Sequence, residues 1–316
     1  MSAPRTRVVR RPVHGVLLLD KPLGLSSNDA LQKAKWLLRA EKAGHTGTLD
    51  PMATGVLPLC FGAATKFSQL HLDADKTYEA IARLGVKTST GDAEGEPIEE
   101  RPVPAISPGK LAEVRARFLG ESQQVPPMHS ALKRDGKALY EYARAGVDLE
   151  RAPRDIHVHE LNLACVPLSN GQPGLRIVAK VSKGTDIRTL AEDIGEALGC
   201  GASLVSLRRL RTGPFEAGQC VSLAALESLD EAARAALLLP VQALLPDHAA
   251  VTLDSDNAGR FLSGLRRRGA WPDQPHVAVY GEEPRALLGT ASTKAGELIP
   301  GRLLAPTEIK QILEAS

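Results

Sequence analysis

The sequence predicts an α+β fold in two parts, a large mixed domain followed by a small β-rich module. Up to residue 247, strand and helix patterns occur without the strict alternation of a doubly wound fold. After Pro246 the chain consists of short apolar pairs separated by Gly, Pro and Asp, with a turn signal about every ten residues. The length of 316 residues suits two domains at a prior of roughly 150 residues each.

The first elements predicted for the large domain are two buried strands, a capped helix and a glycine-rich loop. Short apolar runs at Gly15–Leu19 and Val56–Phe61 predict two buried strands. Ser26 and the two residues after it offer N-caps for a helix that extends to about Ala40. The glycine-rich segment Gly44–Gly55 between helix and second strand predicts a loop.

Later segments continue this mixture of strands and helices. Alternating or short apolar runs predict strands at Lys76–Leu84, Ile156–Leu163, Leu175–Val181 and Leu204–Leu210. Capping residues, apolar periodicity and terminating Gly or Pro residues predict helices from Ser107 to Phe118, from Ile187 to Leu198 and from Asp230 to Leu239. No internal repeat or low-complexity tract interrupts them.

The composition is that of a folded chain with almost balanced charge. It contains 39 Lys and Arg against 37 Asp and Glu, a formal net charge of +2, and 43% of its residues are hydrophobic. This balance excludes an intrinsically disordered chain, which is poor in apolar residues and high in net charge. The totals do not indicate a strongly basic nucleic-acid binder, so any nucleic-acid surface must be local.

The N-terminus predicts a flexible basic arm over residues 1–11, with Arg5, Arg7, Arg10 and Arg11. No apolar run of signal-peptide length follows it, and no segment approaches the roughly 18 apolar residues of a membrane span. The four cysteines form no C-x-x-C pair, which argues against a zinc knuckle or redox motif. We expect reduced, mostly buried thiols in a cytoplasmic protein.

The sharpest candidate for a functional site is the loop GHTGTLDPMATG (Gly44–Gly55). Glycines allow positive φ and close backbone approach, and Asp50 before Pro51 is biased to an extended backbone. Such a loop between two core elements can aim one carboxylate into a cleft. The same residues also fit a tight turn in which Asp50 caps a helix or closes an Asx-turn, so residue chemistry leaves both interpretations open.

A single carboxylate can act as a covalent nucleophile, as in glycosidases and aspartyl-phosphate enzymes. A haloacid-dehalogenase-type phosphotransferase wants a second Asp two residues on, where this chain has Met52. A glycosidase wants a pair of carboxylates, and the nearest acids in the sequence are Glu41 and Asp73. Neither a P-loop nor a G-x-G-x-x-G motif is present, so no nucleotide site is indicated.

Two other groups can bind ligands. His157 and His159 share one face of a predicted strand, but no third ligand stands nearby in the sequence to complete a metal site. Tyr78 suits a core position at the start of its strand. In a chain with 3% aromatic residues it also offers a platform on which a base can stack.

Two arginine clusters stand out against the balanced total charge. Arg208, Arg209 and Arg211 end a predicted strand, and Arg266–Arg268 form a run in the C-terminal module. Such clusters are usually solvated, but their number also fits contacts to a phosphate backbone.

At this point a series of segments resembles the motifs of the bacterial TruB-type tRNA pseudouridine synthases, which convert uridine 55 of the tRNA T loop. In family order they are GVLLLDKPLGLSS (Gly15–Ser27), GHTGTLDPMATGVLPLCFGAATK (Gly44–Lys66), KTYEAIARLG (Lys76–Gly85), TSTGDAEG (Thr88–Gly95), QVPPMHSALKRDGKALYEYARAG (Gln124–Gly146), SKGTDIRTLAEDIGEALGCGA (Ser182–Ala202) and LRRLRTGPF (Leu207–Phe215). The Asp50 loop is the most specific of these motifs. The tail resembles, more weakly, the PUA-like RNA-binding module that commonly follows in this family.

The resemblance implies a fold and a domain division. The fold is α+β, with a pseudouridine-synthase-type mixed or antiparallel sheet flanked by helices and a small C-terminal β-rich PUA-like domain. We expect the catalytic domain at residues 12–247 and the PUA-like RNA-binding domain at residues 248–316. The implied partner is tRNA through its T stem-loop, with no cofactor, metal, membrane or protein partner, and we expect a monomer.

The resemblance also implies roles for single residues. Asp50 matches the catalytic nucleophile, and Arg188 matches a basic residue that pairs with it. His45 matches a position beside the flipped nucleotide, Tyr78 matches the ring that stacks on the target base, and Leu207 matches a position that lines the pocket. A nearby arginine favours the charged form of a carboxylate, which a nucleophile needs.

The first motif and one departure complete this set of residues. Lys21 with Pro22 belongs to the first motif and is implied to support the active-site loop. The family usually carries Tyr where this chain has Asp186, two residues before Arg188. A carboxylate cannot stack on a base, and it can compete with Asp50 for the arginine. His129 stands where many relatives carry Tyr, which is a milder change.

Three hypotheses follow for the function. The first is a cofactor-free isomerase that flips uridine 55 out of the T loop and uses an aspartate nucleophile. The alternative is a tRNA-folding chaperone or RNA-binding protein whose catalysis is reduced by Asp186. The third, an aspartyl-phosphate phosphotransferase, is weakened by Met52 and predicts dependence on magnesium.

Overall fold

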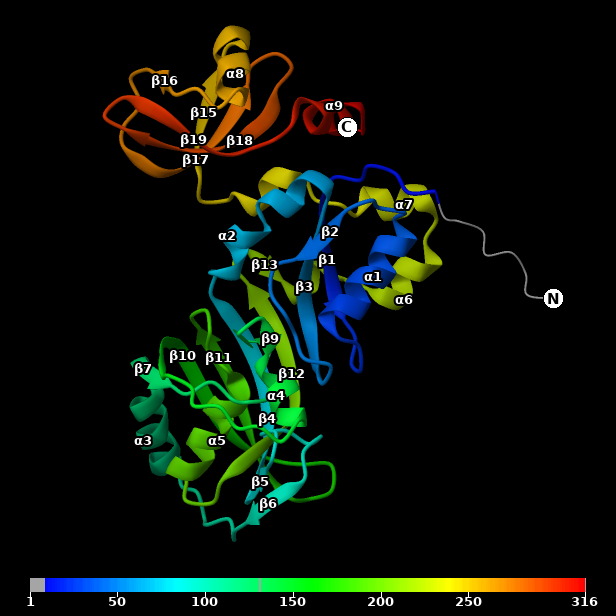
Figure 1. The fold of residues 1–316 in the computed structure, drawn as a ribbon. Helices are drawn as coiled ribbons and strands as arrows, with labels where there is room; N and C mark the ends of the chain where they lie inside the picture. The colour runs from blue at the N-terminus through cyan, green and yellow to red at the C-terminus, as the bar shows by residue number, and fades with distance from the viewer. Residues whose placement is uncertain (1–8, 131, 316) are drawn as a thin grey trace, which may run out of the picture.

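The computed structural model describes residues 9–130 and 132–315. It shows a large sheet with flanking helices and a smaller module at one end (Figure 1). Residues 1–8 of the expected basic arm lie outside the described residues. The last arginines of that arm are anchored, because Arg10 donates to the Ala40 carbonyl at 2.8 Å and Arg11 lies 3.3 Å from Glu231.

The large sheet has ten strands, in the order β14-β1-β3-β12-β4-β11-β10-β7, with β13 paired to β12 and β2 paired to β3. The pairs β1–β14 and β3–β12 are parallel, and the other pairs are antiparallel. Their bounds are β1 Gly15–Lys21, β2 Ala43–His45, β3 Ala53–Phe61, β4 Lys76–Leu84, β7 Gly120–Gln124, β10 Arg154–Pro167, β11 Pro173–Val181, β12 Ala202–Thr212, β13 Phe215–Glu216 and β14 Val221–Ser222.

One face of this sheet carries the largest hydrophobic core. Apolar residues of four helices pack there against alternate residues of the strands. These helices are α1 Ser27–Leu37, α3 Pro108–Phe118, α5 Ile187–Ala197 and α6 Leu223–Ser228. The hydroxyl of Ser26 accepts from Asp29 N to cap α1, and that of Ser107 accepts from Lys110 N to cap α3.

Shorter elements connect these layers. The remaining helical turns of the large domain are η1 Gly62–Lys66, α2 Ser68–Leu72, α4 Leu139–Arg144, η2 Ala217–Gln219, α7 Glu231–Ala236 and η3 Val241–Leu244. Two small hairpins pair β5 Val86–Thr88 with β6 Pro97–Glu100, and β8 Lys133–Arg134 with β9 Lys137–Ala138.

The C-terminal module contains a five-stranded sheet in the order β15-β17-β18-β19-β16. Its elements are β15 Ala249–Leu253, α8 Ser255–Leu262, β16 Arg267–Arg268, β17 Gln274–Gly281, β18 Ala286–Lys294, β19 Glu297–Leu303 and α9 Pro306–Ala315. The sequence pattern predicted the strands but did not separate α8 and α9 from them. The capping residue Asp254, which accepts from Asn257 N, and Pro306 at the start of α9 are the local signals for these helices.

The module packs against the second face of the large sheet. Val16, Leu18 and Val56 of that face form one core cluster with Ala278 and Leu287 of the module. A polar contact supports the same junction, since Lys66 Nζ lies 2.6 Å from Glu308 of α9 and donates to the Leu303 carbonyl at 2.9 Å. The module therefore packs on the face of the sheet opposite to α1 and α5.

The predicted α+β class, with a mixed sheet and a β-rich C-terminal module, is confirmed. The helix expected over 230–239 is shorter, because α7 ends at Ala236 and the following residues lead to Pro240. Cys60 and Cys200 are buried, whereas Cys165 is exposed and Cys220 half-buried, and all of them are free. Within the described residues, no helix has the length and apolar character needed to span a membrane.

Candidate active site

Asp50 lies in the short connection between β2 and β3, which are neighbours in the sheet. The carbonyl of Asp50 accepts from Ala53 N at 3.0 Å, so the chain turns directly after the carboxylate. Gly55, with φ of 103°, passes β12 so closely that a Cβ would lie 2.2 Å from the Arg209 carbonyl. Glycine is therefore required where the loop enters β3.

Three buried polar side chains hold this loop from beneath. Ser27 Oγ donates to the Leu49 carbonyl at 3.0 Å and accepts from Leu49 N at 2.7 Å. Lys21 is 0% exposed, and its Nζ lies 2.9 Å from Pro22 O, 2.6 Å from Leu25 O and 3.5 Å from Pro51 O. The backbone on both sides of Asp50 is thus fixed by side chains from β1 and α1.

The third of these side chains is Arg209 of β12, which is 1% exposed. It donates to Val56 O at 2.7 Å, Gly47 O at 3.3 Å and Thr48 O at 3.4 Å. The expectation that this arginine is solvated or contacts phosphate is wrong. Its guanidinium takes the place of water for two carbonyls of the loop and one of β3.

The Asp50 carboxylate is paired with an arginine from a distant part of the chain. Its Oδ2 lies 3.2 Å from Arg188 Nη2, in the first turn of α5. The Asp50 side chain is 40% exposed, whereas that of Arg188 is 8% exposed. The carboxylate therefore faces an accessible space while the guanidinium stays inside.

Arg188 is surrounded by further acceptors. Its Nη2 donates to the His129 carbonyl at 2.7 Å and lies 3.4 Å from Asp186 Oδ2, and its Nη1 lies 3.5 Å from Asp92 Oδ2. The sequence analysis placed Asp186 near Arg188 but missed Asp92. Asp92 is 4% exposed. In the sequence, an acid directly after a glycine in the quoted motif TSTGDAEG was the available signal.

Asp186 has a structural role of its own. It is the N-cap of α5, and its Oδ1 accepts from Thr189 N at 3.0 Å. Its Oδ2 turns to Arg188, so this carboxylate shares the Nη2 group with Asp50. The helix N-terminus stabilises its negative charge.

The charges around the site shift the pKa values of two groups. Burial raises the pKa of Asp50; Arg188 opposes this rise, whereas Asp186, Asp92 and Glu94 add to it. Burial lowers the pKa of Lys21 to about 8, although the nearby Asp50 charge works in the opposite direction. Arg188 is therefore the group that favours the ionised form of Asp50 against its surroundings.

The other residues implied by the resemblance lie on adjoining strands. Tyr78 of β4 is half-buried and packs against the core on the α1 and α5 side of the sheet. Leu207 of β12, 8% exposed, pairs with Ala80 of β4 and belongs to the same core. His45 ends β2, and its Nδ1 accepts from Gly47 N at 3.4 Å. Burial, followed by the charge of Arg209, lowers the pKa of His45.

The other arginines of the two clusters make contacts within the protein. Arg208 makes a two-point contact with Asp20, at 3.0 and 2.9 Å, and Arg211 lies 3.3 Å from Glu216. In the C-terminal module, Arg266 and Arg268 both contact Glu297. The side chains of Arg266 and Arg268 remain 63% and 88% exposed, and ion pairs in such a setting are weak.

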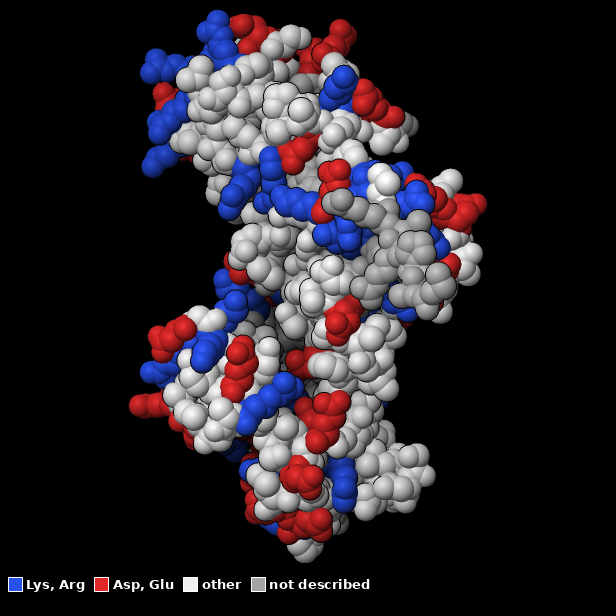
Figure 2. Space-filling model, turned by 45° about the vertical axis from the view of Figure 1, so that its right-hand side comes forward, with Lys and Arg blue, Asp and Glu red and all other residues white. Residues whose placement is uncertain are grey.

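Charge is also mixed at the surface. Figure 2 shows Lys and Arg interspersed with Asp and Glu over the large domain, with Lys and Arg gathered at the outer end of the C-terminal module.

His157 and His159 stack at 4.3 Å, and His159 lies 3.2 Å from Asp75. In the described parts of the chain, no cluster of three or more His, Cys, Asp or Glu is arranged to hold a metal ion.

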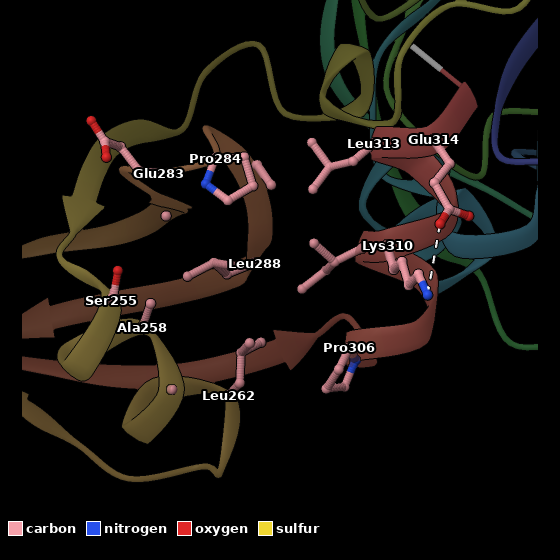
Figure 3. A pocket seen from close by; sticks show the side chains of 14 residues that line it. Ser255, Ala258, Leu262, Glu283, Pro284, Leu288, Pro306, Lys310, Leu313 and Glu314 are labelled. Carbon is pink, nitrogen blue, oxygen red and sulfur yellow. Dashed lines mark ion pairs between the residues drawn. The ribbon is translucent and has the colours of Figure 1, made fainter.

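A hollow of about 500 Å³ lies in the C-terminal module between α8, β18 and α9 (Figure 3). Its wall is mostly apolar, with Ala258, Leu262, Leu288 and Leu313 pointing toward it. All of its lining residues come from positions 255–314. It is therefore separate from the Asp50 site.

The fold of the chain is shared with two solved structures. It superposes with a TM-score of 0.69 and 25% identity on a chain of the crystal structure of a Cbf5-Nop10-Gar1 complex, covering 94% of this chain and 86% of that chain. A second structure, an H/ACA RNP bound to a substrate RNA containing 2'-deoxyuridine, has a TM-score of 0.67 at 23% identity, covering 93% and 86%.

Sequence comparison defines the class, that of the pseudouridine synthases, and the family within it. Residues 35–187 match the model described as TruB family pseudouridylate synthase (N terminal domain), and residues 188–246 match that of the tRNA pseudouridylate synthase B C-terminal domain. The chain is 64% identical over 313 residues to tRNA pseudouridine synthase B of Verminephrobacter eiseniae, covering 98% of this chain and 95% of the relative. The protein of the same name from Ralstonia pickettii is 55% identical over 304 residues, covering 93% and 95%. The chain belongs to the TruB family.

Proposed function

We propose that this chain is a tRNA pseudouridine synthase that isomerises uridine 55 of the T loop, with Asp50 as the nucleophile. The observation that carries the proposal is the accessible Asp50 carboxylate, 3.2 Å from the buried guanidinium of Arg188 on a loop fixed from beneath. The relatives named tRNA pseudouridine synthase B support the reaction and the substrate class.

The reaction needs a nucleophile and a closed space but no redox step. The N1–C1′ glycosidic bond breaks, the uracil turns, and a C5–C1′ bond forms while C5 loses its proton and N1 gains one. An ionised Asp50 can add covalently to the sugar or to the base. Arg188 favours the ionised form of Asp50 by its positive charge.

The target uridine must leave the stacked T loop before it reaches Asp50. Unstacking costs a few kcal/mol, which stacking and phosphate contacts offset. We assign the stacking contact to Tyr78, the pocket wall to Leu207 and the flank of the flipped nucleotide to His45. His45 ends β2 beside the Asp50 loop, Leu207 lies in β12, which pairs with β3, and Tyr78 lies in β4, which pairs with β12.

We assign catalysis to residues 12–247 and additional RNA contacts to residues 248–316. The C-terminal module packs on the face of the sheet opposite to α1 and α5, which suits a separate contact to the same RNA. We further propose a cytoplasmic monomer that acts without a cofactor or protein partner. Sedimentation equilibrium with and without T-stem-loop RNA tests this, and a dimer in either sample contradicts it.

Tritium release from a T stem-loop labelled at C5 of uridine tests the central proposal. The wild-type protein should release tritium, and Asp50→Asn should release none while its RNA affinity stays within about twofold. An inactive, folded and RNA-bound wild-type protein would contradict the enzymatic proposal. A large loss of affinity in Asp50→Asn would show that Asp50 is a structural residue.

Asp186 supports a second candidate, a tRNA-folding chaperone with reduced catalysis. Its carboxylate shares Arg188 with Asp50 and occupies the position of a family tyrosine. Single-turnover rates separate this candidate from the first, because refolding of RNA needs no chemistry. Fast refolding of a misfolded tRNA with very slow tritium release would favour the chaperone. Asp186→Tyr should then raise the release rate.

A further inference from the structure

Gln124 is a buried polar residue that the proposed mechanism does not use. It ends β7, an edge strand of the large sheet, and is 5% exposed. Its amide makes two hydrogen bonds with the backbone of one residue. Nε2 donates to the Asp186 carbonyl at 3.0 Å, and Oε1 accepts from Asp186 N at 2.8 Å.

These hydrogen bonds fix the start of α5. Asp186 is the N-cap, and Arg188 lies two residues further on, in the first helical turn. A side-chain amide that pairs with both the N–H and the C=O of one residue makes the same two hydrogen bonds as a neighbouring strand would. The backbone at the start of α5, which carries Arg188, is therefore fixed to the edge strand β7.

The segment after Gln124 contacts Arg188 itself. The His129 carbonyl accepts from Arg188 Nη2 at 2.7 Å, which is shorter than the 3.2 Å between Arg188 and Asp50. Gln124 therefore fixes the backbone that carries Arg188, and the His129 carbonyl fixes its guanidinium. Gln124 and His129 both lie near the start of the segment that connects β7 to β10 and contains β8, β9 and α4.

We propose that Gln124 is a positioning residue for the Asp50–Arg188 pair, which it aligns by tying the start of α5 to the end of β7. The inference rests on the proposed function, because it assigns Gln124 to the same reaction. Loss of its two hydrogen bonds lets the first turn of α5 shift and moves Arg188 away from Asp50. A displacement of about 1 Å in a catalytic arrangement can lower the rate by about a hundredfold.

The neighbouring residue supplies a matched control. Gln123 lies on the same strand, is exposed, and its Nε2 donates to Asp155 at 3.1 Å rather than to α5. Gln124→Met and Gln123→Met therefore make the same chemical change at adjacent positions. Gln124→Asn keeps the amide but shortens it by one methylene, and it serves as the second variant if Gln124→Met does not fold.

The experiment measures single-turnover rate, RNA affinity and the pH profile of each variant. Gln124→Met should lower the single-turnover rate by about 10–100-fold, with RNA affinity within about twofold of the wild type. Its acidic limb should move to higher pH, because Arg188 holds the pKa of Asp50 down against burial and the charges of Asp186, Asp92 and Glu94. Gln123→Met should leave all three quantities unchanged.

The outcomes separate this inference from the proposed function. If the wild type is active and Gln124→Met matches Gln123→Met, the inference is wrong while the proposed function stands. A slower rate with an unmoved acidic limb, or a loss confined to RNA affinity, also contradicts it. If the wild type is inactive, the proposed function is wrong, and NMR titration of the Asp50 carboxyl in both variants then decides whether Gln124 positions Arg188.

Discussion

Ser27→Ala is the most direct test of how the Asp50 loop is held. Ser27 is 1% exposed and Leu49 is 4% exposed, so the two hydrogen bonds between them are shielded from water. Alanine leaves the Leu49 N–H and carbonyl without this partner, at a cost of about 1–3 kcal/mol each. The free energy of unfolding should therefore fall by about 2–6 kcal/mol, and the freed loop should lower the single-turnover rate by about 10–100-fold.

Ser26→Ala provides the control for this experiment. The Ser26 hydroxyl caps α1 by accepting from Asp29 N at 3.1 Å in an exposed setting. Its loss should cost about 1 kcal/mol and leave the rate unchanged. Urea unfolding measures the stability of both variants, and tritium release measures their rates. The reasoning is refuted if Ser27→Ala is no less stable than Ser26→Ala and has the wild-type rate.

Two further predictions concern pH. Asp186→Asn keeps an oxygen that can cap α5 but removes a negative charge that raises the pKa of Asp50, so the acidic limb of the pH–rate profile should move to lower pH. An unmoved limb would show that the charge of Asp186 does not act on Asp50. Burial lowers the pKa of Lys21 in the folded protein to about 8 from its usual value of 10.5. Between these two pH values the unfolded chain therefore binds more protons than the folded protein, and the contribution of Lys21 to stability increases with pH. Lys21→Met should lose this increase in urea unfolding between pH 8 and 10.5, and an equal pH dependence in both proteins would contradict the assignment.

Much of the fold could be predicted because its signals are local. Ser26 precedes a run of apolar residues at helical spacing, and the structure caps α1 with that residue. The alternation in Lys76–Leu84 coincides with the bounds of β4. Each pattern depends on residues only a few positions apart, whose geometry is set by the helical or strand repeat. In the C-terminal module, by contrast, weak patterns left α8 and α9 undetected.

The arginines of β12 show what such local signals cannot decide. Arg208, Arg209 and Arg211 look alike in the sequence, yet Arg209 is buried under the Asp50 loop while Arg208 pairs with Asp20 at the sheet surface. Successive residues of a strand point to opposite faces. Their surroundings therefore depend on which strands lie on either side.

The sequence by itself determined the fold class, the order of the motifs and the glycine-rich loop that carries Asp50. Each of these depends on residues that lie close together in the chain. Only the tertiary structure decided which charges meet at Arg188. Asp50, Asp92 and Asp186 come from separate parts of the chain and reach one guanidinium through the order of the strands and the start of α5. The physical reason is that backbone periodicity is a short-range property, whereas an ion pair requires two distant segments to be packed together.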